Sequence, residues 1–249
     1  MDLFSQKIER SELKEGDHVY SWRKERLISH HGIFIGEGKI IHFVNPKKKS
    51  TGNPYLAPFR GFATSSDGSG KKEKTICPNS FCKLEKVAGS GVRTSCIDCF
   101  VKKGSLCRYK YQASREFLLA KTVGGTCTTA ESDPPEEVIY RATYLHENGY
   151  GKYDLSSNNC EDFALYCKTG LWSTDKEYQG RSSQANMVHS THKTKNKKDE
   201  AMGEKVYRYA TAIPRTFLKR ESKDLGLRND VVKVPVEELS SFCTSLRQK

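Results

Sequence analysis

Alternating apolar and polar residues predict a β-hairpin close to the N-terminus. Residues 27–35 and 39–44 are rich in β-branched and aromatic side chains, and a Gly-Glu-Gly sequence at 36–38 separates them. The two glycines favour a three-residue loop whose second glycine is left-handed, and this loop pairs Ile35 with Lys39. The pattern therefore predicts two antiparallel strands of a sheet.

The register of this hairpin determines where its histidines lie. With the three-residue loop, His30 pairs with Val44, so His30 and His42 are diagonal neighbours on one face, about 7–8 Å apart at the backbone. A two-residue turn instead pairs Ile33 with His42 and puts His30 on the opposite face. We take the three-residue loop, and we expect the two imidazoles to reach each other.

A helix is predicted in the second half of the chain, after Asp133 and before Gly149. Asp133 is expected to cap it, and prolines suit the first turn, where the missing N–H has no helical partner. The side chains expected to face the core are Val138, Ile139, Ala142 and Leu145.

A second helix is predicted to begin with a cysteine, Cys160. Asn158 or Asn159 can cap it, the acidic pair at 161–162 suits the positive end of the helix dipole, and Gly170 closes the segment. A helix N-terminus stabilises an anion, so we expect the Cys160 thiol to have a lower pKa than a free cysteine. Cys160 is therefore a candidate nucleophile.

A nucleophilic cysteine needs a base within hydrogen-bond reach, and the base needs a third group that orients it. Cys160, His30 and His42 supply these three roles. A single histidine in an apolar strand is more often a packed residue than a catalyst, but two on one face beside such a thiol favour catalysis. His18 lies beside the turn before a predicted strand, and we expect it at the surface.

The segments at 30–42 and 159–161 together resemble the signature of lecithin:retinol acyltransferase-like (LRAT domain) proteins, which include the small phospholipase/acyltransferases. The arrangement is most similar to the plant members. The resemblance implies an α+β fold of the circularly permuted, papain-like (NlpC) type. In such a fold an antiparallel sheet packs against the helix that carries the nucleophilic cysteine.

The resemblance also assigns roles to individual residues. His30 falls on the catalytic base, His31 on a variable position, His42 on the second histidine and Cys160 on the nucleophile. The chain differs from animal members at Asp162, where they usually carry a histidine. It also lacks their apolar anchor, since no stretch approaches the roughly 20 apolar residues of a membrane span.

These features predict a thiol acyltransferase or a phospholipase A-type hydrolase. Cys160 would attack a glycerophospholipid ester and form a thioester, and water, an amine or an alcohol would accept the acyl group. No cofactor is required for this chemistry. Two alternatives stay open: a non-catalytic lipid- or protein-binding module on the same fold, and a cysteine peptidase or amidase.

Composition adds a basic surface to this picture. The net charge is +12, and lysines cluster at 47–49, at 71, 72 and 74, and at 193, 195, 197 and 198. Basic loops of this kind attract anionic membranes, and we expect peripheral contact of this sort. Nucleic acid is not an expected partner, because no recognition motif accompanies the lysines. Residues 1–8 lack a secretory h-region, so a cytoplasmic location is expected.

Nine cysteines in a cytoplasmic chain point to metal ligands, reactive thiols or small buried side chains more than to disulfides. Cys77, Cys82, Cys96 and Cys99 have nearly the two-knuckle spacing of a Cys₄ zinc ribbon, so they are candidate ligands of a structural zinc ion. The alternative is that this segment covers the active-site cleft and its cysteines pack as small apolar residues.

The domain organisation follows from these segments. A catalytic domain is expected over residues 8–172, with a Cys-rich insertion at about 46–107. Residues 173–249 are expected to form a basic, partly disordered C-terminal extension, because their composition shifts to Ser, Thr, Lys, Gln and Asn.

Overall fold

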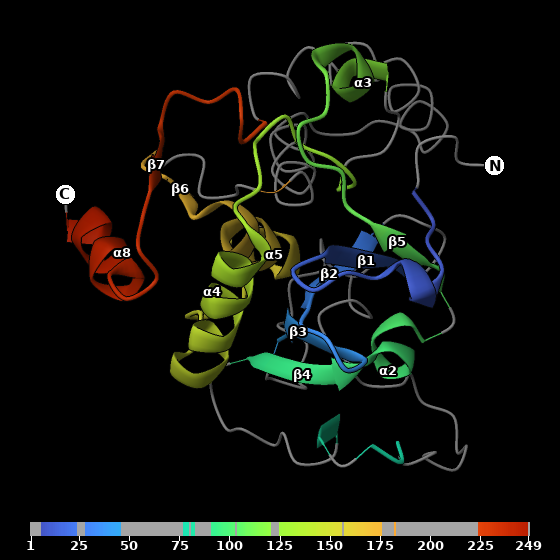
Figure 1. Ribbon diagram of the computed structural model, residues 1–249. Coiled ribbons are helices and arrows are strands. Elements are labelled where there is room, and N and C mark those ends of the chain that lie inside the picture. Colours follow the sequence, from blue (N-terminus) through green and yellow to red (C-terminus); the bar gives the residue numbers. More distant parts are fainter. Residues whose placement is uncertain are drawn as a thin grey trace, which may run out of the picture.

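The computed structural model of the protein is built around a five-stranded antiparallel sheet in the order β4-β3-β2-β1-β5 (Figure 1). The residues that it describes are 6–23, 28–45, 77–79, 81–82, 91–102, 104–120, 125–155, 157–175, 182 and 224–248. The strands of the sheet are β1 (His18–Arg23), β2 (Ile28–Phe34), β3 (Lys39–Phe43), β4 (Val92–Cys96) and β5 (Leu106–Arg108). The predicted α+β class with an antiparallel sheet is confirmed.

Short helices and a second, two-stranded sheet surround this core. The helices are η1 (Arg10–Glu12), α2 (Ile97–Val101), α3 (Arg115–Ala120), α4 (Pro135–Asn148), α5 (Cys160–Thr169) and α8 (Leu239–Gln248). The second sheet pairs β6 (Leu171–Ser173) with β7 (Val231–Lys233). None of the helices in the described ranges is long and apolar enough to cross a membrane.

The β2–β3 hairpin has the predicted register. Ile33 lies opposite Ile41, and the Ile35 N–H donates to the Lys39 carbonyl over 3.0 Å. All three loop residues, 36–38, have positive φ angles of 89°, 48° and 69°. Glycine adopts such angles without a Cβ penalty, which explains why it occupies two of the three positions. The three-residue loop is confirmed.

The two faces of the sheet bury different parts of the chain. α5 packs on β2 and β3 on one face, with α4 beside it (Figure 1). The core on this face contains Ile33, Ile41, Phe43, Val138, Ala142, Leu145, Phe163, Ala164, Tyr166 and Cys167. The opposite face is covered by α2, and its buried side chains are Ile8, Val19, Phe34, Ile40, Phe100 and Leu106. Alternate residues of β2 therefore face different partners.

Helix α4 begins as predicted, but Asp133 is not its cap. The N-cap position is Pro134, and Asp133 forms ion pairs with Arg141 (2.6 Å) and Lys233 (2.7 Å) instead. The Arg141 guanidinium is nearly buried, and a buried cation needs a carboxylate partner. Asp133, which we predicted as the helix cap, therefore neutralises the charge of Arg141 instead.

Part of the predicted Cys-rich insertion belongs to the main sheet. Within residues 46–107, β4 pairs along β3 and β5 pairs along β1, so these segments extend the sheet at both edges. The Pro- and Gly-rich stretch at 46–75 lies outside the described residues. So do the three lysine clusters, at 47–49, 71–74 and 193–198.

The end of the predicted C-terminal extension packs against the core. β7 pairs with β6, and Val234, Val236 and Leu239 join the cluster between α4, α5 and the sheet. The Tyr166 hydroxyl donates to the Val234 carbonyl over 2.9 Å. Residues 183–223 lie outside the described part of the chain.

Candidate active site

Cys160 is the first residue of α5, as predicted, and its position is fixed by a capping box. The Asn159 side chain accepts from the backbone N–H groups of Glu161 (2.8 Å) and Asp162 (3.2 Å). The Asp162 carboxylate in turn accepts from the Asn159 N–H over 2.9 Å. Gly170, left-handed with φ 65°, ends the helix. The polar run before the cysteine therefore specifies the helix start.

The thiol lies against the backbone of β2. Cys160 Sγ is 3.8 Å from the Ser29 carbonyl oxygen, and the His31 N–H donates toward the sulfur. The described β2–β3 ladder is at Ile33 and Phe34, so residues 29–31 lie beyond it. α5 thus brings the thiol to the backbone on either side of His30, whereas the His30 ring lies on the face of β2 that α2 covers.

The Cys160 thiol is neutral in this structure, contrary to the expected lowering of its pKa. Burial raises the pKa of Cys160 to about 12, because the side chain is only 4% exposed and a thiolate loses its hydration there. The His31 N–H acts in the opposite direction, and the neighbouring Glu161 and Asp162 carboxylates raise the pKa further. Desolvation is the largest influence on the pKa of this thiol.

His30 and His42 form the predicted pair. His30 Nε2 and His42 Nδ1 are 2.8 Å apart, and the rings are nearly perpendicular at 88°. His42 Nε2 is in turn 2.8 Å from Ser95 Oγ on β4. The Phe100 ring of α2 packs on both imidazoles, with centroids 5.1 Å from His30 and 5.6 Å from His42. Ser95 and Phe100 therefore both contact the His30–His42 pair.

A second imidazole network lies on the other face of β2, under α5. His31 Nδ1 is 2.9 Å from His18 Nε2, and His31 Nε2 is 2.7 Å from Ser29 Oγ. His18 Nδ1 contacts the Tyr111 hydroxyl at 2.8 Å, and its ring stacks on Tyr109 at 4.3 Å. Both nitrogens of His31 are therefore occupied by structural partners.

The prediction that His18 lies at the surface is wrong. His18 is 1% exposed and His31 is completely buried. Burial lowers the pKa of His31 to about 3, and it lowers the pKa of His18 well below its ordinary value. Both rings are neutral at physiological pH, because the charged form would lose its hydration without gaining a counter-ion.

Sequence reasoning missed the residues that support the pair, Ser95 and Phe100. In the β3–β4 ladder His42 lies opposite Arg93, which makes Ser95 its diagonal neighbour. Only the pairing of β3 with β4 reveals this contact, and the sequence does not predict that pairing. The burial of His31 could have been predicted from the sequence, because His31 alternates with Ile33 and Ile35, which face the apolar core.

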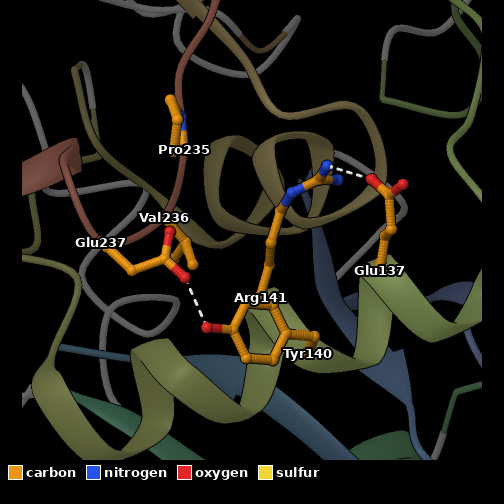
Figure 2. A pocket seen from close by; sticks show the side chains of 6 residues that line it. All are labelled: Glu137, Tyr140, Arg141, Pro235, Val236 and Glu237. Carbon is orange, nitrogen blue, oxygen red and sulfur yellow. Dashed lines mark hydrogen bonds and ion pairs between the residues drawn. The ribbon is translucent and has the colours of Figure 1, made fainter.

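The four candidate zinc ligands lie together. Their sulfur atoms are all within 4.8 Å of one another. A cavity of about 250 Å³ lies elsewhere, between α4 and the segment that precedes α8, and contains none of the site residues (Figure 2). It is lined by Glu137, Tyr140, Arg141, Pro235, Val236 and Glu237.

Comparison with known proteins identifies the family of the chain. The sequence model of the lecithin retinol acyltransferase family matches residues 11–173, more than half of the chain. The chain belongs to this family. Within it, the chain is similar to Protein LEAD-SENSITIVE 1 of Arabidopsis thaliana, with 38% identity over 248 residues that cover 98% of this chain and 93% of the plant protein. The predicted plant-type resemblance is confirmed.

Membership of the lecithin retinol acyltransferase family indicates an acyltransferase- or phospholipase-like function with a lipid substrate. The name of the Arabidopsis relative specifies no reaction. The matched segment contains β1–β6, α4 and α5, and it ends at Ser173. β7 and α8 lie beyond it, although they pack on the same core.

Proposed function

We propose that this protein is a cysteine-dependent acyltransferase or phospholipase that acts on glycerophospholipid esters through a thioester on Cys160. One observation carries the proposal: α5 places the thiol against the β2 backbone at Ser29 and His31, the two residues that flank His30, and the His30 ring is hydrogen-bonded to His42. Family membership supports a lipid ester as the substrate. A thiol, an imidazole and a group that orients it are the parts that nucleophilic catalysis requires.

The hydrogen bonds of the imidazole pair suit a base at His30. If His30 Nε2–H donates to His42 Nδ1, then His42 Nε2–H donates to Ser95 Oγ, and both of these imidazole N–H groups have an acceptor. This assignment leaves His30 Nδ1 unprotonated, and we assign the thiol proton to that atom. His42 then accepts a hydrogen bond from the imidazolium that forms, the role that a carboxylate or amide has in other triads.

The proposed reaction has two halves. Cys160 Sγ bonds to the ester carbonyl carbon while His30 takes the thiol proton, and the carbonyl becomes an oxyanion. The intermediate collapses by breaking the ester C–O bond, and His30 returns the proton to the leaving alkoxide. His30 then deprotonates water, an amine or an alcohol, whose oxygen or nitrogen bonds to the thioester carbonyl carbon. The C–S bond breaks, and His30 returns the proton to the Cys160 sulfur.

The raised pKa of Cys160 determines when the proton moves. With a pKa of about 12, the resting thiol is neutral, so transfer to His30 accompanies the attack on the carbonyl. The positive end of α5 then acts on the oxyanion of the intermediate. The Cys160 N–H is the first donor that we propose for it, because this group lies at the start of the helix.

We propose that the fold is the circularly permuted papain-like arrangement, in which His30 and His42 precede Cys160 in the chain. We further propose a cytoplasmic location with peripheral contact to anionic membranes through the lysine clusters. Nucleic acid is not a proposed partner.

Product formation tests the function. The protein is incubated with phosphatidylcholine vesicles, with and without a primary amine, and free fatty acid and N-acyl product are quantified. We expect product from the wild type and from Cys243→Ser, a control on α8, but none from Cys160→Ser. Product from Cys160→Ser would contradict the proposal. No product from any form would favour the non-catalytic binding module.

A further inference from the structure

We propose that Cys77, Cys82, Cys96 and Cys99 bind one zinc ion, and that this ion holds Ser95 and Phe100 against the His30–His42 pair. The zinc site rests on its own geometry. Only its consequence for the reaction rests on the proposed function.

The distances between the sulfur atoms fit a tetrahedral thiolate site. Zinc–sulfur bonds are about 2.3 Å long, so the sulfurs of a Cys₄ tetrahedron lie about 3.8 Å apart. Cys77 Sγ and Cys96 Sγ are 3.7 Å apart, and all four sulfurs lie within 4.8 Å of one another. A disulfide would place two sulfurs about 2.05 Å apart. The distances between the four sulfur atoms are therefore those expected of zinc ligands and not of a disulfide.

Backbone N–H groups point at two of the sulfurs. The Cys96 N–H donates to Cys82 Sγ over 3.0 Å, and the Cys99 N–H donates to Cys96 Sγ over 3.4 Å. Such bonds favour thiolates and orient them, as outer hydrogen bonds do at metal sites. Several thiolates this close repel one another unless a cation lies between them. A soft divalent ion such as zinc meets this need.

Exposure argues against the alternative that these cysteines pack as small apolar residues. Cys96 is buried, but Cys77, Cys82 and Cys99 are only partly buried. Cysteines used as apolar filling are usually fully buried, as Cys107 and Cys167 are in this chain.

The site joins separate parts of the fold. Cys96 ends β4 and caps α2, Cys99 lies within α2, and the other two ligands come from the short segment at 77–82 (Figure 1). A metal there fastens this segment to the edge strand β4. Structural zinc commonly replaces a hydrophobic core in small, loop-rich segments.

The neighbours of two ligands contact the catalytic pair. Ser95 precedes Cys96, and its hydroxyl is 2.8 Å from His42 Nε2. Phe100 follows Cys99, and its ring packs on both imidazoles. Ser95 and Phe100 are therefore positioning residues, and the zinc ion fixes the backbone from which both project.

Metal content tests the site. The full chain is purified without chelator, and the number of zinc ions per chain is measured by inductively coupled plasma mass spectrometry. We expect one zinc in the wild type and in Cys243→Ser, and less than a tenth of that in Cys77→Ser/Cys82→Ser. Cobalt exchanged into the wild type should give the absorption of tetrahedral thiolate coordination. Zinc retained by the double variant, or a metal-free wild type without cobalt absorption, overturns the site.

A second measurement tests the link to the histidines without using activity. In protein labelled with ¹⁵N-histidine, the imidazole signals of His42 are followed while a chelator removes zinc from the wild type. We expect the signals to shift or broaden as they do in Ser95→Ala, which should keep its zinc. Unchanged His42 signals after zinc loss overturn the positioning role. Neither result depends on acyl chemistry.

Discussion

At the scale of single residues, two adjacent histidines on β2 have different surroundings. His30 is half-buried and bonded to His42, whereas His31 is completely buried and bonded to His18 and Ser29. One strand can present both networks because consecutive side chains point to opposite faces. The hairpin register predicted the contact between His30 and His42, but the sequence did not predict the buried contacts of His31.

Substitution of His30 and of His31 should have different effects on activity. We expect His30→Ala to lower kcat/KM by about 10²–10⁴-fold, the usual contribution of a general base. We expect His31→Gln to lower it by less than tenfold, because both nitrogens of the His31 ring contact structural partners. Initial rates at pH 7.5, with folding verified by circular dichroism, check this. Equal losses in the two variants would contradict the assignment of the base.

The protonation state of the resting thiol is a second residue-scale prediction. Because the pKa of Cys160 is about 12, the rate of its alkylation by iodoacetamide should rise with pH throughout the range 6–10, without a plateau. Peptide mapping of modified Cys160 in substrate-free protein measures this rate, and Cys243 serves as the internal reference. A plateau with a midpoint below pH 8 would indicate a preformed thiolate–imidazolium pair.

At the scale of elements, the start of α5 and the β2–β3 loop were predictable because local chemistry determines them. Glycines at positions with positive φ fix the loop, and Asn159 fixes the helix start. Asp162, which stands where animal family members usually carry a histidine, completes the capping box. The ion pairs of Asp133 could not be predicted in the same way, because its partners Arg141 and Lys233 lie elsewhere in the chain.

The cap of α5 gives an element-scale prediction. Asn159→Ala removes the acceptor for two helix N–H groups and the donor to the Leu155 carbonyl and Ser182 Oγ. We expect the free energy of unfolding to fall by about 1–2 kcal/mol, the upper part of the range for lost N-caps. Urea unfolding measures this change. A change below about 0.3 kcal/mol would contradict the assigned role.

At the scale of the whole molecule, the arrangement depends on contacts that no local pattern encodes. β4 and β5, at the two edges of the sheet, come from the segment that we predicted as an insertion, and β4 supplies Ser95. Val234 and Val236 from the predicted extension enter the main core. Hydrophobic periodicity predicts which elements form, but strand order and docking depend on partners distant in the sequence.

The buried imidazoles make the stability of the whole domain sensitive to acid. The pKa of His31 is lowered to about 3 in the folded protein, while the unfolded chain has the ordinary value of about 6.5. Above pH 6.5 neither state binds the proton, so the full stability is present. Between pH 6.5 and 3 only the unfolded state binds it, so stability falls as pH falls, by about 1.4 kcal/mol per pH unit for each histidine.

Urea unfolding at several pH values checks this linkage. His31→Gln should show a shallower loss of stability between pH 6.5 and 4 than the wild type, although it is less stable at pH 8. His18 still contributes, because its pKa is also lowered by burial. Equal slopes for the variant and the wild type would show that His31 does not stay neutral in the folded state.

The mass of the intact protein after incubation with mixed phospholipid vesicles tests directly whether Cys160 forms a thioester. We expect an added acyl mass that hydroxylamine removes, present in the wild type and in Cys243→Ser but absent from Cys160→Ser and His30→Ala. An adduct that persists in Cys160→Ser, or one that resists hydroxylamine, would contradict a thioester on Cys160.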